Sequence, residues 1–256
     1  MNTILKLEHI QKYYGNEGNI TKAIKDISFS VEAGEFLGIM GASGSGKTTL
    51  LNCISTIDTV SAGHIFLEGT DITEINPKSL ARFRRENLGF VFQDFNLLDT
   101  LTISENIALA LTINKVPVGK INQQVQDIAE TLNITDILNK YPYQVSGGQK
   151  QRCGIARAFA IDPPILLMDE PFAALDFLTR AELQTQLLTI QQRLPRTIVL
   201  VTHQLEEALL LGQKIVVMHS DSSLWECSLA DNAYPRDVDE PQMRELKQRI
   251  TEECRK

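Results

Sequence analysis

A glycine-rich segment that ends in a lysine and a threonine has the composition needed to hold phosphate. It reads GASGSGKT at residues 41–48 and fits the pattern G-x-x-x-x-G-K-[ST]. Glycines let backbone N–H groups turn inward around phosphate oxygens, and the N-terminus of a following helix adds a favourable dipole. The predicted nucleotide-binding residues are Gly41, Ala42, Ser43, Gly44, Ser45, Gly46, Lys47, Thr48 and Thr49, with Lys47 on the β- and γ-phosphates and Thr48 on Mg²⁺.

Two adjacent carboxylates follow an apolar run, ILLMDEP at residues 165–171. In open α/β sheets ligands bind beyond the carboxyl ends of the strands, so both acids would point toward a ligand. Asp169 suits Mg²⁺, and Glu170 suits a general base that polarises the attacking water. Without a phosphate-binding loop, such a pair is as often a solvated strand end.

The elements that would position these residues can be read from short apolar runs. Each run is continuously apolar, which is typical of strands covered on both faces in a parallel sheet, and helical patterns separate them. These runs are EFLGIM (35–40), LGFVFQ (88–93), PILLMD (164–169), TIVLVT (197–202) and KIVVMH (214–219). The sequence therefore predicts an α/β fold. The first seventy residues predict a small antiparallel sheet, and residues 97–160 predict a helical insertion without strands.

Composition excludes several classes of protein. The chain has 256 residues, of which 43% are hydrophobic and 22% charged, as in an ordinary globular protein. Its 25 Lys and Arg against 32 Asp and Glu give a net charge of −7, which argues against nucleic acid as a partner. The cysteines predict free thiols in a reducing compartment; they are Cys53, Cys153, Cys227 and Cys254. The opening MNTILKLEHIQKYYG lacks a signal-peptide pattern, so we expect any role at a membrane to involve another chain.

A second glycine motif, VSGGQ at residues 145–149, begins a helical stretch. By itself Ser-Gly-Gly is more often an N-cap and turn than an anion site. However, GASGSGKT, FVFQ, VSGGQ, LLMDEP, ALD and VTH follow one another in an order that resembles the ATPase subunit of ATP-binding cassette (ABC) transporters. The resemblance covers about residues 3–220, and VSGGQ is specific to this family among P-loop proteins.

The resemblance implies an architecture and partners. It implies a P-loop NTPase (RecA-like) parallel-sheet core with an N-terminal antiparallel β subdomain and an inserted α-helical subdomain at about 94–160, all within an ATPase domain at 1–220. It also implies ATP with Mg²⁺, a second cassette in a homodimer, and a transmembrane permease that places the chain at the cytoplasmic face of the membrane. Residues 221–256 are expected to be an accessory segment. It would end in an amphipathic helix near 241–253, with Met243, Leu246 and Ile250 on one face.

The resemblance also assigns roles to matching positions. Gln93 would sense Mg²⁺ and water, and Asp176 would lie at the dimer interface. The residues expected to contact ATP held by the opposed cassette are Ser146, Gly147, Gly148 and Gln149. His203 would contact the γ-phosphate, although a histidine after a strand is more often a structural hydrogen-bonder. Tyr14 aligns better than Tyr13 with the aromatic residue that stacks on adenine, and strand alternation places the two on opposite faces.

The two parts of the chain resemble different branches of the family. Up to about residue 152 the sequence resembles bacitracin-type peptide exporters and the lipoprotein-release and macrolide-export branch, whereas from about Pro163 it resembles nitrate, taurine and sulfonate importers. The segment Asp94–Thr102 is expected to meet the permease through Phe95, Leu97 and Leu98, although without the family such side chains are more often core residues. The segment belongs to the exporter-like part, so we favour export. Import is the alternative. A soluble ABC ATPase of DNA repair or translation and a P-loop kinase fit less well, because the chain has one cassette, no sustained heptads and no acceptor lid.

Overall fold

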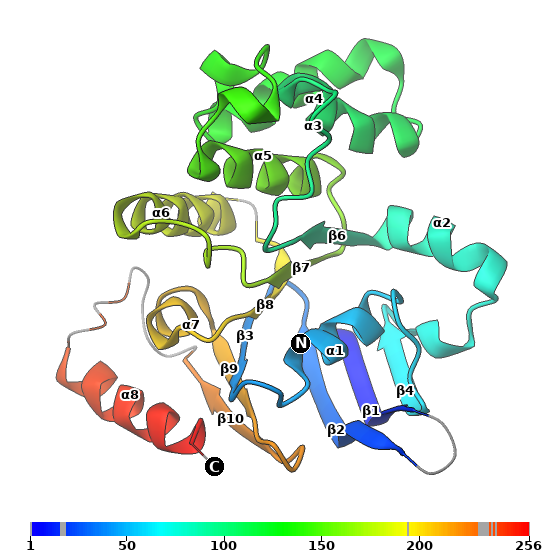
Figure 1. Cartoon of the computed structure of the whole chain (residues 1–256), viewed down its shortest axis with the longest axis vertical. Helices are drawn as coiled ribbons and strands as arrows, with labels where there is room; N and C mark the ends of the chain where they lie inside the picture. Colours follow the sequence, from blue (N-terminus) through cyan, green and yellow to red (C-terminus); the bar gives the residue numbers. More distant parts are fainter. Residues whose placement is uncertain are drawn as a thin grey trace. The chain divides into compact units, whose positions relative to one another are not determined.

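The computed structural model describes residues 2–15, 19–193, 195–229, 236, 238 and 240–255. The chain forms two compact units (Figure 1). The first unit combines Met1–Ala81 with Arg196–Lys256, and the second unit is the intervening Arg82–Pro195. The helical insertion predicted at about 94–160 therefore lies inside the second unit. No helix in the part of the chain that the structure describes has both the length and the apolar character of a membrane span.

The first unit contains the predicted antiparallel sheet. Its strands are β1 (Thr3–Tyr14), β2 (Thr21–Glu32), β4 (Ala62–Leu67) and β5 (Thr70–Asp71), in the order β2-β1-β4-β5. Leu5 of β1 lies between Val31 of β2 and Leu67 of β4, and all three side chains are buried. The alternation of buried and exposed side chains along β1 and β2 is typical of a sheet with one covered face.

The first unit also holds the strand that carries the phosphate-binding segment. This strand is β3 (Phe36–Gly41), which pairs in parallel with β8 (Thr197–Val201) and β9 (Lys214–Met218). The first five residues of β3 and all of β8 are buried, as their uninterrupted apolar sequences predict. Helices α1 (Lys47–Ile54) and α7 (Leu205–Leu211) belong to the same unit, and a Cβ on Gly38 of β3 would lie 3.3 Å from that of Ala208.

Beyond Asp221 the chain adds one strand that was not predicted from the sequence, followed by the helix expected near residues 241–253. Strand β10 (Leu224–Ser228) pairs antiparallel with β9, and helix α8 (Pro241–Glu253) follows. Met243 and Ile250 of α8 are buried in one apolar cluster with Met40 of β3. In Figure 1, α8 and β10 are the red and orange elements near the C-terminus. The C-terminal segment thus packs on the strand that leads into the phosphate-binding segment.

The second unit consists of two parallel strands and a set of helices. Strand β6 (Leu88–Val91) pairs with β7 (Ile165–Asp169), and no strand separates them in the chain, as predicted. The helices between and after them are α3 (Ile103–Ile113), α4 (Val118–Thr131), α5 (Gly147–Ala160) and α6 (Phe177–Arg193). Short 3-10 turns occur at Ile72–Glu74 in the first unit and at Thr135–Ile137 and Pro142–Gln144 in the second.

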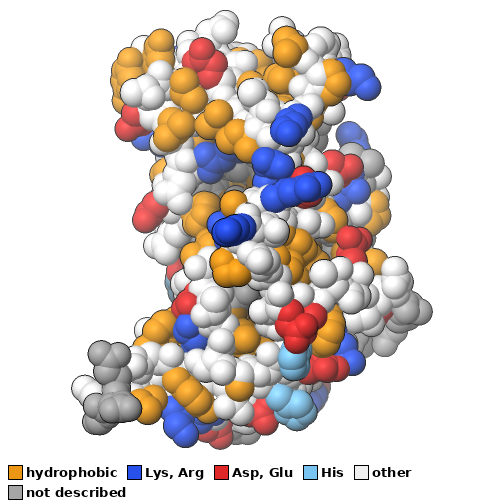
Figure 2. Space-filling view, turned by 90° about the vertical axis from the view of Figure 1, so that its right-hand side faces the viewer, with side chains coloured by type: hydrophobic (Ala, Val, Ile, Leu, Met, Phe, Trp, Pro, Cys, Tyr) orange, Lys and Arg blue, Asp and Glu red, His pale blue; other side chains and the backbone are white. Residues whose placement is uncertain are grey.

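Helix α2 (Pro77–Asn87) connects the two units along the chain and has no buried residue. It carries four cations, Lys78, Arg82, Arg84 and Arg85. Figure 2 shows several Lys and Arg side chains (blue) close together on the face that it draws. The acidic net charge of the chain therefore coexists with locally basic surface.

Candidate functional site

The phosphate-binding segment forms a glycine turn between β3 and α1. Gly41, Gly44 and Gly46 have φ angles of 148°, 81° and 96°. A Cβ on Gly41 would overlap the carbonyl of Met218, and one on Gly46 would lie 2.6 Å from the carbonyl oxygen of Ala23. Gly46 is the N-cap of α1 and supplies no capping side chain, and the first turn of α1 has no acidic residue. The turn therefore suits an anion at the start of α1.

Lys47 and Ser45 direct polar groups toward this turn. The Nζ atom of Lys47 donates hydrogen bonds to the carbonyls of Gly41 (3.0 Å) and Ala42 (2.8 Å), so the lysine folds back over the loop. Ser45 is 2% exposed, and its Oγ has no hydrogen-bond partner among the described residues. A buried hydroxyl without a partner costs free energy, which phosphate oxygens in the loop would offset. This observation fits the predicted nucleotide.

Tyr14 is fixed beside α1 by residues that the sequence reasoning did not select. Its hydroxyl donates a 2.6 Å hydrogen bond to Asp58, which also accepts one of 2.5 Å from Lys12. Burial and the bond to Asp58 raise the pKa of Tyr14, while a hydrogen bond with Thr49 lowers it. The ammonium of Lys12 lies 4.8 Å from the ring centroid, and 41% of Tyr14 remains exposed.

Tyr13, the alternative adenine partner, makes different contacts. Its hydroxyl donates to Gln11, and Lys22 lies 5.3 Å from its ring centroid. Tyr14 alone of the two interacts with Thr49 of α1. Tyr14 is therefore the tyrosine nearer the phosphate-binding turn, and it remains the predicted partner of adenine. No pattern in the sequence pointed to Asp58, which lies 44 positions from Tyr14.

His203 leaves the sheet at the same edge as the glycine turn. Ile39 of β3 pairs with Val201 of β8, and the N–H of Thr202 donates to the carbonyl of Ile39. The hydroxyl of Thr202 donates to buried Glu207 at 2.5 Å and accepts from the N–H of Gln204 at 3.0 Å. These bonds fix the turn that holds exposed His203. The predicted phosphate-contacting histidine and the glycine turn thus lie at one edge of the first unit's parallel strands.

Gln93, Asp169 and Glu170 lie at one strand edge of the second unit. Val91 of β6 pairs with Met168 of β7, so Gln93 and the two acids all follow the carboxyl ends of parallel neighbours. Glu170 has a φ of 45°, a left-handed conformation that is unusual for a residue with a Cβ. Such strain is commonly concentrated at functional sites. The structure brings these three predicted residues to one edge.

The second glycine motif begins α5 with a capping box. The Oγ of Ser146 accepts from the N–H of Gln149, and the Gln149 side chain accepts from the N–H of Ser146. The N-cap role that we weighed for Ser146 is therefore present, and S-x-x-Q is the local signal for it. Gly147 is exposed, whereas Gly148 is buried against Thr179, whose methyl group a Cβ on Gly148 would overlap.

Asp176 caps the next helix. Its carboxylate accepts from the N–H (3.1 Å) and hydroxyl (2.7 Å) of Thr179 in α6. These hydrogen bonds lower the pKa of Asp176. Because Thr179 also packs against Gly148, Asp176 is linked through one residue to the glycine motif. Phe177 and Leu178, the first residues of α6, are 79% and 71% exposed.

The segment expected to meet a permease is organised by Asn106 of α3. Asn106 is fully buried, and its amide donates to the carbonyls of Leu98, Leu101 and Thr102 while its oxygen accepts from the N–H of Leu98. Leu98 is 48% exposed, whereas Phe95 is partly buried. Leu98 is thus more exposed than Phe95, and more of its side chain is available to a partner.

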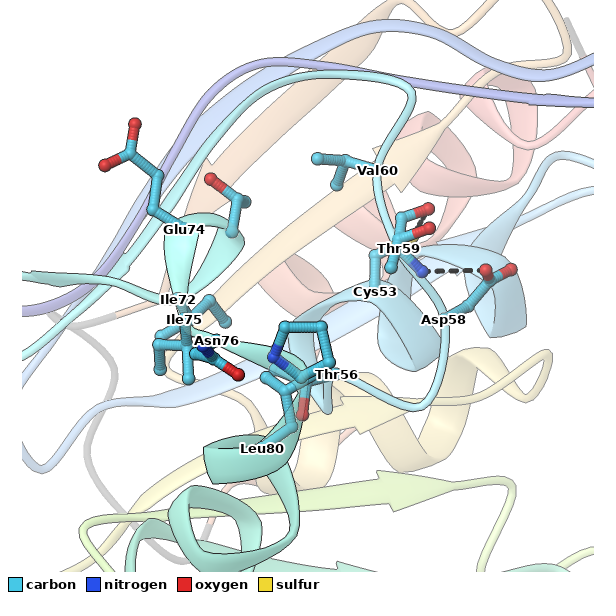
Figure 3. A pocket seen from close by; sticks show the side chains of 12 residues that line it. Cys53, Thr56, Asp58, Thr59, Val60, Ile72, Glu74, Ile75, Asn76 and Leu80 are labelled. Carbon is cyan, nitrogen blue, oxygen red and sulfur yellow. Dashed lines mark hydrogen bonds between the residues drawn. The ribbon is translucent and has the colours of Figure 1, made fainter.

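A cavity of about 330 Å³ lies elsewhere in the first unit (Figure 3). Its lining includes Cys53, Asp58, Thr59 and Leu80, and the hydrogen bond from the N–H of Thr59 to Asp58 measures 2.7 Å. None of residues 41–48 lines it, so it is distinct from the glycine turn. Burial raises the pKa of the Cys53 thiol to about 11, which makes it a weak nucleophile.

Comparison with known proteins identifies the family. The family model described as "ABC transporter" matches residues 24–173. This range includes the glycine turn, the VSGGQ motif, Asp169 at the end of β7 and Glu170 directly after it. The chain belongs to the ABC transporter family. Proteins of this family hydrolyse ATP to power transport, and their cassettes work as dimers with a membrane permease. The chain is thus an ABC transporter ATPase, and the resemblance and the P-loop fold expected from the sequence are confirmed.

ATP-binding proteins of several transport systems are similar to this chain. The bacitracin export ATP-binding protein BceA of Halalkalibacterium halodurans is 48% identical over 78% of this chain and 79% of its own length. The trimethylamine N-oxide transport system ATP-binding protein TmoW of Pelagibacter ubique is 37% identical over 84% of this chain and 69% of its own. Among solved structures, a dimeric cassette MJ0796 bound to ADP and Pi has a TM-score of 0.80 and 33% identity, covering 88% of this chain and 99% of that chain.

Proposed function

We propose that this ABC ATPase binds Mg-ATP at the turn of residues 41–48 and hydrolyses it with Glu170 as general base. The observation that carries the proposal is the turn itself: three glycines with positive φ, an uncapped α1, and the buried, unpartnered Oγ of Ser45. Lys47 would exchange its bonds to loop carbonyls for bonds to phosphate. Tyr14, held by Asp58 on its hydroxyl and by Lys12 over one face, would stack adenine on its other face.

Mg²⁺ prefers oxygen ligands, which three of the predicted site residues offer. Thr48, Asp169 and the amide of Gln93 would hold it, and the bound ion would neutralise charge that develops on the phosphates. Glu170 would accept a proton from the attacking water, because its position just after Asp169 places it at the same strand end. His203 would contact the γ-phosphate from the turn fixed by Thr202 and Glu207.

A second copy of the chain would complete each site. Ser146, Gly147, Gly148 and Gln149 lie at the N-terminus of α5, where backbone N–H groups favour an anion. In a two-fold dimer they would face the γ-phosphate held by the other copy, with Asp176 at the interface. The exposed apolar pair Phe177 and Leu178 next to Asp176 supports an interface there.

We infer that the transporter exports peptides, antimicrobials or lipophilic compounds, or confers resistance to them, from the cytoplasmic face of the membrane. Similarity to the bacitracin exporter, at 48% identity, supports this direction. Import is the second candidate, because a methionine import ATP-binding protein of Bacillus thuringiensis aligns over 89% of the chain at 37% identity, whereas the bacitracin export protein aligns over 78%.

The experiment is to purify the native complex through a tag on this chain and to identify the membrane protein that accompanies it. A large permease, in a complex whose ATPase activity is stimulated by a peptide antibiotic or lipophilic compound, would support export. A small permease with a separate anion-binding protein would instead establish import. Recovery of nucleic acid or ribosomes in place of a membrane protein would contradict the transport function itself.

A further inference from the structure

The backbone that follows Gln93 is held in an unfavourable conformation. Phe95 and Asn96 have φ angles of 55° and 47°, so two consecutive residues with Cβ atoms are left-handed. In this region the Cβ crowds the following carbonyl oxygen, which is why glycine usually occupies it. Such a conformation persists only where the surrounding structure holds it. A group outside the segment must therefore stabilise it.

Arg157, near the end of α5, supplies that group. Its Nη1 donates a 2.6 Å hydrogen bond to the carbonyl of Asn96, and its Nη2 donates a 3.2 Å bond to the carbonyl of Phe95. Among the residues that the structure describes, no carboxylate forms an ion pair with Arg157. Burial lowers the pKa of its guanidinium, so the two carbonyls are the acceptors that compensate for lost water.

The same segment lies along α5 beside two glycines. A Cβ on Gly154 would lie 3.6 Å from the carbonyl oxygen of Phe95, and one on Gly147 would lie 3.9 Å from the tip of the Phe95 ring. Residues seven apart lie on one face of a helix. Phe95 therefore covers the α5 face from Gly147, at the glycine motif, to the turn that precedes Arg157.

We propose that Arg157 is a positioning residue that fastens the segment after Gln93 to α5, so that Gln93 and the Ser146–Gly148 motif move together. The inference rests on the proposed function, in which Gln93 acts on the ATP of its own cassette and Ser146 on that of the opposite cassette. The fastening links the two ATP sites through one guanidinium. If a bound permease moves the segment after Gln93, α5 and its Ser146–Gly148 motif would move with that segment.

Steady-state ATPase kinetics of the full chain test this role with Arg157→Ala, Arg157→Lys and the matched control Gly154→Ala. Because small misplacements of a reacting group cost up to ~10²-fold in rate, Arg157→Ala should lower kcat by about 10–100-fold. The KM for ATP should change by less than about threefold, since the phosphate-binding turn lies in the first unit. Arg157→Lys should recover part of the loss, because its ammonium offers donors on a single nitrogen rather than a fork. Gly154→Ala should keep the wild-type kcat, because its Cβ makes only an ordinary contact.

A double-mutant cycle separates positioning from a general effect on folding. If Arg157 acts through the segment, Arg157→Ala should cost at most about twofold in a Gln93→Ala background, because interacting residues are not additive. An equal loss in both backgrounds would overturn the proposal.

Hydrogen exchange of the amides at 94–98 gives a readout that does not depend on activity. Exchange should be faster in Arg157→Ala than in the wild type and in Gly154→Ala, and unchanged exchange would refute the fastening. Absence of ATP hydrolysis by the wild-type complex, or full turnover by Glu170→Gln, would instead refute the proposed function. The exchange measurement would still decide the role of Arg157 in that case.

Discussion

Two glycines of the phosphate-binding turn offer a matched pair of alanine substitutions. Gly44 and Gly46 both have positive φ, 81° and 96°. A Cβ on Gly44 would have no heavy atom within 4 Å, whereas one on Gly46 would lie 2.6 Å from the carbonyl oxygen of Ala23 and 3.3 Å from Ile24. Gly44→Ala therefore tests backbone strain alone. Gly46→Ala adds a steric overlap between α1 and β2.

The expected costs follow from these surroundings. A left-handed alanine costs about 1–2 kcal/mol, and reduced freedom of the unfolded chain returns about 0.4–1 kcal/mol. Gly44→Ala should therefore lower the free energy of unfolding by ~0–1.6 kcal/mol. In Gly46→Ala the shift that accommodates the Cβ should lower the free energy of unfolding by a further ~1–3 kcal/mol, as in overpacked cores. Because this shift displaces the first turn of α1, ATP affinity should fall by at least ~10-fold, or about 1.4 kcal/mol.

Urea unfolding without nucleotide measures the stability term, and titration calorimetry with ATP measures affinity. The m-value should stay constant across the three proteins, so that changes in midpoint report stability. Wild-type stability and affinity in Gly46→Ala, or equal effects of the two substitutions, would refute the claim that close approach of α1 to β2 shapes the turn.

Two further predictions concern residues that support the site. Asp58→Asn should lower the free energy of unfolding by about 1–3 kcal/mol at pH 7, because Asp58 accepts charge-assisted bonds from Lys12 and Tyr14. Burial raises the pKa of Asp58, but the hydrogen bonds from Lys12, Tyr14 and Thr59 outweigh burial and lower the pKa below 3.8. The stability that Asp58 contributes is therefore complete at a pH above 3.8 and is lost as the pH falls through the folded-state pKa. A stability difference in urea that does not narrow below pH 3.8 would contradict this assignment. Ile250→Ala should cost about 2–5 kcal/mol, because Ile250 is fully buried with Met40, whereas partly buried Leu246→Ala should cost less. Wild-type urea midpoints for both variants would show that α8 does not stabilise the core.

The sequence predicted best what depends on local pattern. Continuous apolar runs such as TIVLV and ILLMD predicted β8 and β7, because a strand buried on both faces has an uninterrupted apolar sequence rather than an alternating one. The glycine turn could be predicted because backbone conformation dictates its residues at Gly41 and Gly46. The capping box of Ser146 and Gln149 is also local, so S-x-x-Q could have predicted it.

Contacts between distant residues could not be predicted from pattern. Tyr14 and Asp58 are 44 positions apart, and Arg157 meets Asn96 across 61 positions. Strand β10 was missed because LWECS is only partly buried and includes a charged residue, so that its pairing with β9 rather than its composition makes it a strand. Buried Asn106 gave no signal either, since its role depends on the loop carbonyls that surround it.

The central claim is that two copies share each ATP, with the turn of one copy opposite the Ser146 motif of the other. Size-exclusion chromatography with light scattering tests it on Glu170→Gln, which should bind Mg-ATP but lose the general base, a loss of ~10²–10⁴-fold in rate. With Mg-ATP this variant should elute as a dimer, and adding Ser146→Arg should return it to a monomer that still binds ATP. A Glu170→Gln protein that stays monomeric at saturating Mg-ATP, or a Ser146→Arg double variant that still dimerises, would contradict the account.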